Sequence, residues 1–111
     1  MKKFTKSKTP AWYGDLAPLM EFPREGVFSK VLVKTQVFNL TLMCLAKGTD
    51  ILAHTSTREA AVTVLKGRGV FYLGRKKITM KPGVLIFMPK NAPHALRAKD
   101  DLAILLSLAG K

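Results

Sequence analysis

The chain has 111 residues, the size of one domain, and 48% of them are hydrophobic, which argues against intrinsic disorder. A single cysteine excludes an internal disulfide, and no apolar run reaches the length of a signal peptide or membrane span, so we expect a reduced, cytoplasmic protein. The net charge of +12 is spread along the sequence without interleaved aromatic residues, which argues against nucleic acid as a partner but suits an anionic small molecule.

Residues 1–18 are predicted to form an N-terminal arm or edge segment. Pro10, Gly14 and Pro18 interrupt any regular element there, and we expect Trp12 and Tyr13 to pack the arm against the rest of the protein. Residues 19–111 carry no further boundary and are interpreted as a single domain.

The clearest strand pattern covers residues 36–46, after a first strand at residues 27–34. One face of this second strand is fully apolar and is interpreted as the core face; its members are Phe38, Leu40, Leu42, Cys44 and Ala46. The opposite face contains Asn39 and Thr41 between its apolar residues.

Short strand patterns separated by turn signals continue to the end of the chain. They cover residues 51–54, 60–65, 70–73, 77–80, 84–88, 95–98 and 102–108. No helix-period segment longer than one or two turns interrupts them. About nine short strands with regular turns predict an all-β sandwich or barrel.

The chain contains two histidines, His54 and His94, and each follows a strand that begins after a glycine. If the two strands line one barrel, both imidazoles would point into the same cavity. Two imidazoles in one cavity indicate a metal site or a proton-transfer site.

The segment from Gly48 to Ala98 resembles the two sequence motifs of the cupins. The matching residues are Gly48, His54 and Gly67 for the first motif, and Gly83, Pro89 and His94 for the second. The resemblance implies a cupin double-stranded β-helix, or jelly-roll, barrel with an N-terminal arm. It also implies a homodimer, which the exposed edges of an open sandwich favour independently.

The sequence departs from these motifs at the positions that matter for metal. Ser56 stands at the second histidine, and Ala60 or Ala61 stands at the glutamate. Asn91 replaces a glycine of the second motif. The resemblance implies that a metal-binding cupin holds its ion with three histidines and one carboxylate. Of these four ligands, only His54 and His94 have counterparts in this chain.

Several functions are consistent with this reduced set. The favoured one is binding of a small molecule, with His54, Ser56, Tyr72 and His94 lining the pocket. The alternative is a metal-dependent dioxygenase or isomerase that holds Zn, Fe, Ni or Mn weakly through His54 and His94. The sequence favours a metal-bound pocket and a metal-free pocket equally.

The metal-dependent alternative would need another ligand, such as Cys44 or Glu59. A third possibility is similar to the sugar epimerases of the superfamily, with a histidine as base and Tyr72 as acid. Arg58 and Arg97 flank the two histidine segments and suit a carboxylate or phosphate, although pairing at the surface is the commoner role of arginine.

Overall fold

The computed structural model describes residues 10–110 of the chain. Within this range lie one 3-10 helix, η2 (Ala17–Leu19), and nine strands. The strands are β1 (Val27–Lys34), β2 (Phe38–Leu45), β3 (Asp50–His54), β4 (Ala60–Lys66), β5 (Gly69–Leu73), β6 (Lys76–Met80), β7 (Leu85–Met88), β8 (His94–Ala98) and β9 (Leu102–Ala109). The prediction of an all-β chain with nine short strands is confirmed.

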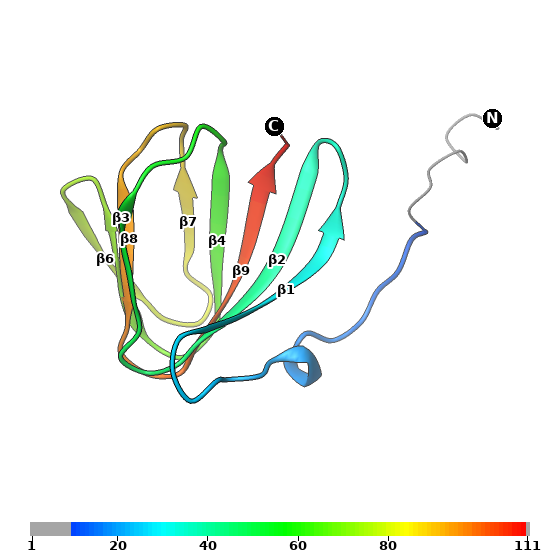
Figure 1. Cartoon of the computed structure of the whole chain (residues 1–111), viewed down its shortest axis with the longest axis horizontal. Helices are drawn as coiled ribbons and strands as arrows, with labels where there is room; N and C mark the ends of the chain where they lie inside the picture. The colour runs from blue at the N-terminus through cyan, green and yellow to red at the C-terminus, as the bar shows by residue number, and fades with distance from the viewer. Residues whose placement is uncertain (1–9, 111) are drawn as a thin grey trace.

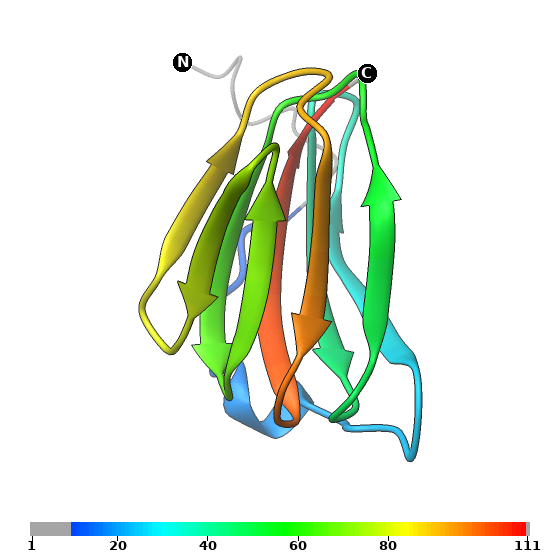
Figure 2. The same ribbon diagram turned by 90° about the vertical axis from the view of Figure 1, so that its left-hand side faces the viewer.

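The strands form two antiparallel sheets that face each other (Figure 1). One sheet has the order β1-β2-β9-β4-β7 and the other has the order β3-β8-β5-β6, which Figure 2 shows from its outer side. Because most neighbours in a sheet are distant in sequence, the chain crosses repeatedly between the sheets. This is the expected jelly-roll barrel.

The core consists of side chains that point inward from both sheets. Its fully buried members include Leu45, Val64, Phe71, Met80 and Leu102, each at most 1% exposed. Strand alternation explains this selection, because only every second residue of a strand faces the other sheet. Burial of each large apolar side chain contributes about 1.5–3 kcal/mol.

The second half of strand β2 is buried on both faces, which corrects the predicted core face. Met43 and Leu45 point into the barrel, whereas Leu42 and Cys44 lie on the outer side. The outer side is apolar because the segment before β1 covers it with Leu19, Met20 and Phe22. Residues 19–22 therefore shield one part of the five-stranded sheet from water.

The preceding residues leave the barrel (Figure 1). Trp12 is 50% exposed and Tyr13 is 98% exposed, so the expectation that Tyr13 packs the arm was wrong. Residues 1–9 of the predicted arm lie outside the described part of the chain. No helix in the described part is long and apolar enough to cross a membrane.

Candidate functional site

A cavity opens between the two sheets at the end of the barrel where β3 ends and β4 begins. Its inner chamber has a volume of about 170 Å³ and is lined mainly by apolar side chains from both sheets. The inner lining consists of Met43, Ile51, His54, Val62, Met88, His94, Ala95, Leu96, Ile104 and Leu106. The inner chamber therefore suits an apolar group.

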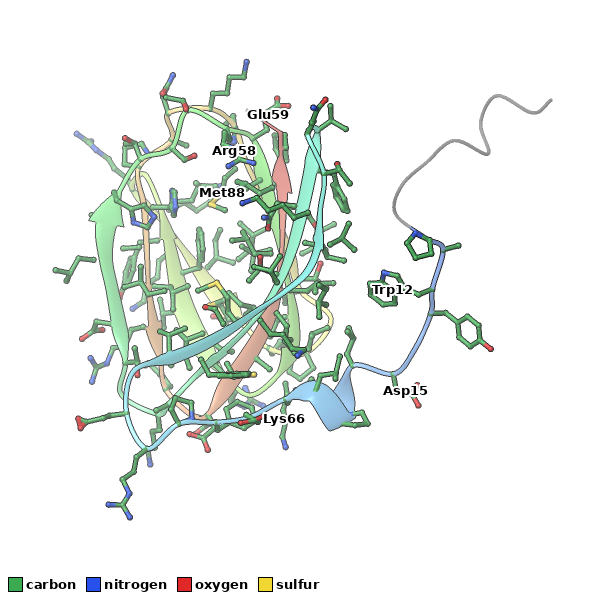
Figure 3. All side chains as sticks on the ribbon, turned by 45° about the vertical axis from the view of Figure 1, so that its right-hand side comes forward. Trp12, Asp15, Arg58, Glu59, Lys66 and Met88 are labelled. Atoms are coloured by element: carbon green, nitrogen blue, oxygen red, sulfur yellow. The ribbon has the colours of Figure 1, made fainter. Side chains whose placement is uncertain are left out.

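The mouth of the cavity is more polar than the chamber. It has a volume of about 270 Å³ and shares His54, Met88, His94 and Leu106 with the chamber. Ser56, Arg58, Ala60, Pro89 and Leu108 complete its lining. Figure 3 shows Met88 and Arg58 between the two sheets, with Arg58 nearer the open end.

The fold brings the two histidines together at the border between chamber and mouth. His54 of β3 pairs directly with His94 of β8 in the antiparallel ladder. Their ring centroids lie 4.1 Å apart and the rings meet edge to face at 61°. The register of the β3–β8 pair shifts between Ile51 and His54, so an irregularity in the ladder sets this pairing.

Backbone carbonyls fix the orientation of both rings. Nδ1 of His54 lies 2.9 Å from the Leu52 carbonyl oxygen, and Nδ1 of His94 lies 3.0 Å from the Ala92 carbonyl oxygen. A carbonyl oxygen only accepts, so each Nδ1 donates and each neutral ring keeps its lone pair on Nε2. His94 also stacks on Phe71, with centroids 6.0 Å apart and planes inclined by 2°.

Ser56 joins the two motif segments at the mouth. Its carbonyl oxygen accepts a hydrogen bond from the Asn91 N–H at 2.7 Å, and its Oγ accepts one from the Arg58 N–H at 3.1 Å. Asn91 has a φ of 65°, the left-handed region that asparagine tolerates better than most residues. Asparagine thus preserves the turn at a motif position where the cupin pattern has glycine.

Tyr72 is absent from the cavity lining, which corrects the predicted site. Its side chain is 41% exposed, whereas the neighbouring Phe71 is 1% exposed and lies under His94. Adjacent residues of a strand point to opposite faces, so only one of the two aromatic residues can face the barrel. An acid–base pair of a histidine with Tyr72 is therefore not assembled here.

The side chains at the cavity do not fit a resident metal ion. No cluster of three or more metal-binding side chains occurs among residues 10–110. Cys44 lies behind β2 among apolar residues, and Glu59 lines a hollow on the outer side of the five-stranded sheet. Two imidazoles fall short of the three or four protein ligands that such ions take.

The two flanking arginines have different surroundings. Arg97 forms an ion pair with Asp50 at 2.7 Å, with both side chains about half exposed at 50% and 48%. Arg58 donates from Nε to the Ala109 carbonyl oxygen at 2.6 Å and lines the mouth. The sequence did not distinguish them, and it also missed the apolar chamber, where Met43 and Met88 resembled ordinary core residues.

Comparisons with known proteins agree with this architecture. The family model described as "Cupin domain" matches residues 41–108. A conserved protein of unknown function from Streptococcus pyogenes is 29% identical, with a TM-score of 0.81 over 93% of this chain and 90% of its own. A cupin superfamily protein from Desulfitobacterium hafniense is 23% identical, with a TM-score of 0.80 over 95% and 94%, and this likeness shows the fold alone.

One curated relative from Aquifex aeolicus, an uncharacterized protein, is 34% identical over 62 residues, or 56% of this chain. The chain spans about half the length of that relative, 51%. The match therefore covers only part of each chain, and it does not assign an activity to this one.

Proposed function

Because the chain belongs to the cupin family, we propose that it binds a small organic molecule in the cavity between its sheets. The supporting observation is the meeting of an apolar chamber of about 170 Å³ with two oriented imidazoles at its border. The chamber takes the apolar body of the ligand, and His54 and His94 accept hydrogen bonds from it through Nε2.

The volume sets the scale of the ligand. A buried apolar cavity of about 150 Å³ holds one benzene ring, so a chamber of similar size fits one aromatic ring or a short aliphatic chain. Ser56 lies at the mouth, where its position suits a contact with a larger ligand.

Methionine methyl NMR tests this proposal. Met43 and Met88 line the chamber, whereas Met80 is fully buried in the core and Met20 packs on the outer side of the sheet. Titration with indole is expected to shift the Met43 and Met88 signals and to leave Met20 and Met80 in place. Unchanged Met43 and Met88 signals at millimolar indole and phenol would refute binding in the chamber.

The role of the histidines is tested with a matched pair of probes. Indene has nearly the shape of indole but lacks its N–H. We expect indole to bind about 2- to 10-fold more tightly, the range for one neutral hydrogen bond. The difference should shrink in the His54→Phe and His94→Phe variants; equal affinities for the wild type would contradict Nε2 acceptance.

We also propose that the chain forms a homodimer through the uncovered part of the five-stranded sheet. Val37, Leu85 and Phe87 are 75%, 66% and 56% exposed, and the hollow that Val37 and Phe87 line also includes Phe38 and Ala61. A second copy is the favoured occupant because the same chain also presents Trp12 and Tyr13 on an arm that leaves its own barrel. In such a dimer, the arm of each copy would pack on the exposed part of the partner's five-stranded sheet, which would cover both the sheet and the arm.

Sedimentation velocity tests the dimer. The wild type should be dimeric at micromolar concentration, and the dimer should strengthen with salt because two molecules of charge +12 repel each other. Phe87→Glu should give a monomer. Leu52→Glu is the matched control, since Leu52 is 80% exposed on β3 of the other sheet and should leave the dimer intact. A monomeric wild type would exclude this interface.

A further inference from the structure

Arg58 is held at the mouth of the cavity without an acidic partner among residues 10–110. The ion pair found in this part of the chain joins Arg97 to Asp50 instead. Arg58 is fixed by its own backbone N–H, which donates to Ser56 Oγ at 3.1 Å, and by Nε, which donates to the Ala109 carbonyl oxygen at 2.6 Å. One edge of the guanidinium is thus anchored, and its two terminal nitrogens remain as donors.

Among residues 10–110, the mouth and the open hollow that Arg58 lines contain basic side chains and no acidic one. The lining of the chamber and of the mouth contains neither aspartate nor glutamate. Arg58 also borders an open hollow lined by Lys34, Thr35 and Gln36, which places a second cation beside the rim. The neighbouring Glu59 lines the outer hollow with Val37 and Phe87, on the other side of the sheet.

These observations suit a ligand with one apolar end and one anionic end. We propose that the cavity selects amphipathic monocarboxylates, with the apolar body in the inner chamber and the carboxylate on Arg58 at the mouth. This inference rests on the proposed ligand-binding function and adds the chemical class of the ligand. A carboxylate is favoured over a bare anion because a planar guanidinium donates two parallel hydrogen bonds to its two oxygens.

The preorganisation of Arg58 strengthens the argument. A free arginine side chain loses rotamer freedom when it binds an anion, and this loss weakens many exposed ion pairs. The bond from Nε to the Ala109 carbonyl oxygen restricts the side chain before any ligand arrives. A carboxylate at the mouth therefore gains a donor that is already oriented.

The test compares 3-phenylpropanoate with 3-phenylpropanamide by calorimetry on the full chain, with the methionine methyl signals as the reporter of position. The two probes share the phenyl ring and chain length and differ in charge. We expect the acid to bind the wild type about 10- to 100-fold more tightly than the amide, the range for one charge-assisted hydrogen-bonding group. The preference should decrease with salt.

Two variants separate Arg58 from the general positive charge. Arg58→Gln should reduce affinity for the acid about 10-fold or more and leave the amide unchanged. Arg97→Gln removes an equal charge from the outer surface and should leave both affinities within about twofold, because Arg97 lies on the opposite face of β8 from the chamber-lining Leu96 and its pair with Asp50 is half exposed and screened. Circular dichroism checks that both variants are folded.

The outcomes distinguish the two proposals. Equal binding of acid and amide, with Met43 and Met88 shifts, would overturn the carboxylate assignment and keep the ligand-binding function. An equal loss of acid affinity in both arginine variants would assign the preference to net charge and also overturn it. Tighter binding of phenyl phosphate than of 3-phenylpropanoate would replace the carboxylate by a phosphate. No shift of Met43 or Met88 with any probe would reject both proposals.

Discussion

Substitution of Gly67 by alanine is expected to destabilise the barrel in two ways, by a left-handed backbone conformation and by steric overlap with another strand connection. Gly67 has a φ of +88°, and a Cβ there would overlap the carbonyl oxygen of Asp101 and lie 3.0 Å from the Cα of Leu102. The left-handed conformation costs an alanine about 1–2 kcal/mol. Overlap with rigid backbone adds about 1–3 kcal/mol, as other overpacked sites do. We therefore expect Gly67→Ala to lower the free energy of unfolding by about 2–5 kcal/mol.

Two other glycines supply matched controls. Gly48 has the same φ of +88°, but no atom lies within 4 Å of the position that a Cβ would take, so Gly48→Ala carries only the conformational cost of about 1–2 kcal/mol. Gly69 lies in β5 without a positive φ, and its Cβ would approach the Arg97 carbonyl oxygen at 2.6 Å. Gly69→Ala therefore carries only the steric cost.

Urea unfolding followed by far-UV circular dichroism measures the three variants, because Trp12 lies on the exposed arm and reports poorly on the barrel. Each glycine-to-alanine change also restricts the unfolded chain, which stabilises each variant by about 0.4–1 kcal/mol. The sum of the two controls contains this term twice and Gly67→Ala contains it once, so the Gly67→Ala loss should exceed the sum of the other two by about 0.4–1 kcal/mol. A Gly67→Ala variant as stable as Gly48→Ala would refute the close approach of Gly67 to Asp101.

Three single side chains give further predictions. Burial raises the pKa of the Cys44 thiol, helped by the charge of Glu21 and opposed by a backbone hydrogen bond from Glu21. Iodoacetamide at pH 8 should therefore alkylate native protein more slowly than urea-unfolded protein. The stability that protonated Cys44 contributes should fall as pH rises above about 8.5, the ordinary thiol pKa, because the thiol of the unfolded chain ionises first. Phe71→Ala should cost about 3–5 kcal/mol in urea unfolding and shift the ring signals of His94, which stacks on Phe71; unshifted ring signals would contradict that contact. Arg97→Gln should change stability by less than about 1 kcal/mol in the same assay, because its pair with Asp50 is half exposed, and a larger loss would show a buried role.

The positions of the strands along the chain and the pairing of the histidines were accessible from the sequence. Turn glycines and strand alternation locate each strand, and motif spacing places His54 and His94 at the ends of strands that neighbour each other in a cupin barrel. The sequence did not show which side chains of a given strand face the interior of the barrel. Phe71 and Tyr72 are both large and aromatic, so composition alone does not say which one faces the core.

The same difficulty affected β2 for a different physical reason. A sheet normally has one wet face, so the more apolar face of β2 was expected to be the core. The covering segment with Leu19, Met20 and Phe22 removes the wet face, so apolar residues occur on both sides. Arg58 was equally undetermined, since a loop arginine turns inward or outward according to distant partners such as the Ala109 carbonyl oxygen.

The motif positions that are not metal ligands serve the fold in this chain, whether the motif residue is kept, as at Gly67, or replaced, as at Asn91. Gly67 approaches Asp101 too closely for any side chain, and Asn91 keeps a left-handed turn that closes onto the Ser56 carbonyl. The bonds from Nδ1 of both histidines to backbone carbonyls would orient metal ligands, but they orient hydrogen-bond acceptors equally well. A motif match of this kind therefore predicts where the cavity lies, whereas the side chains around it decide the chemistry. Our proposal of an organic anion rather than a resident cation rests on those side chains, with Ser56 and Ala60 in place of ligands and Arg58 at the rim.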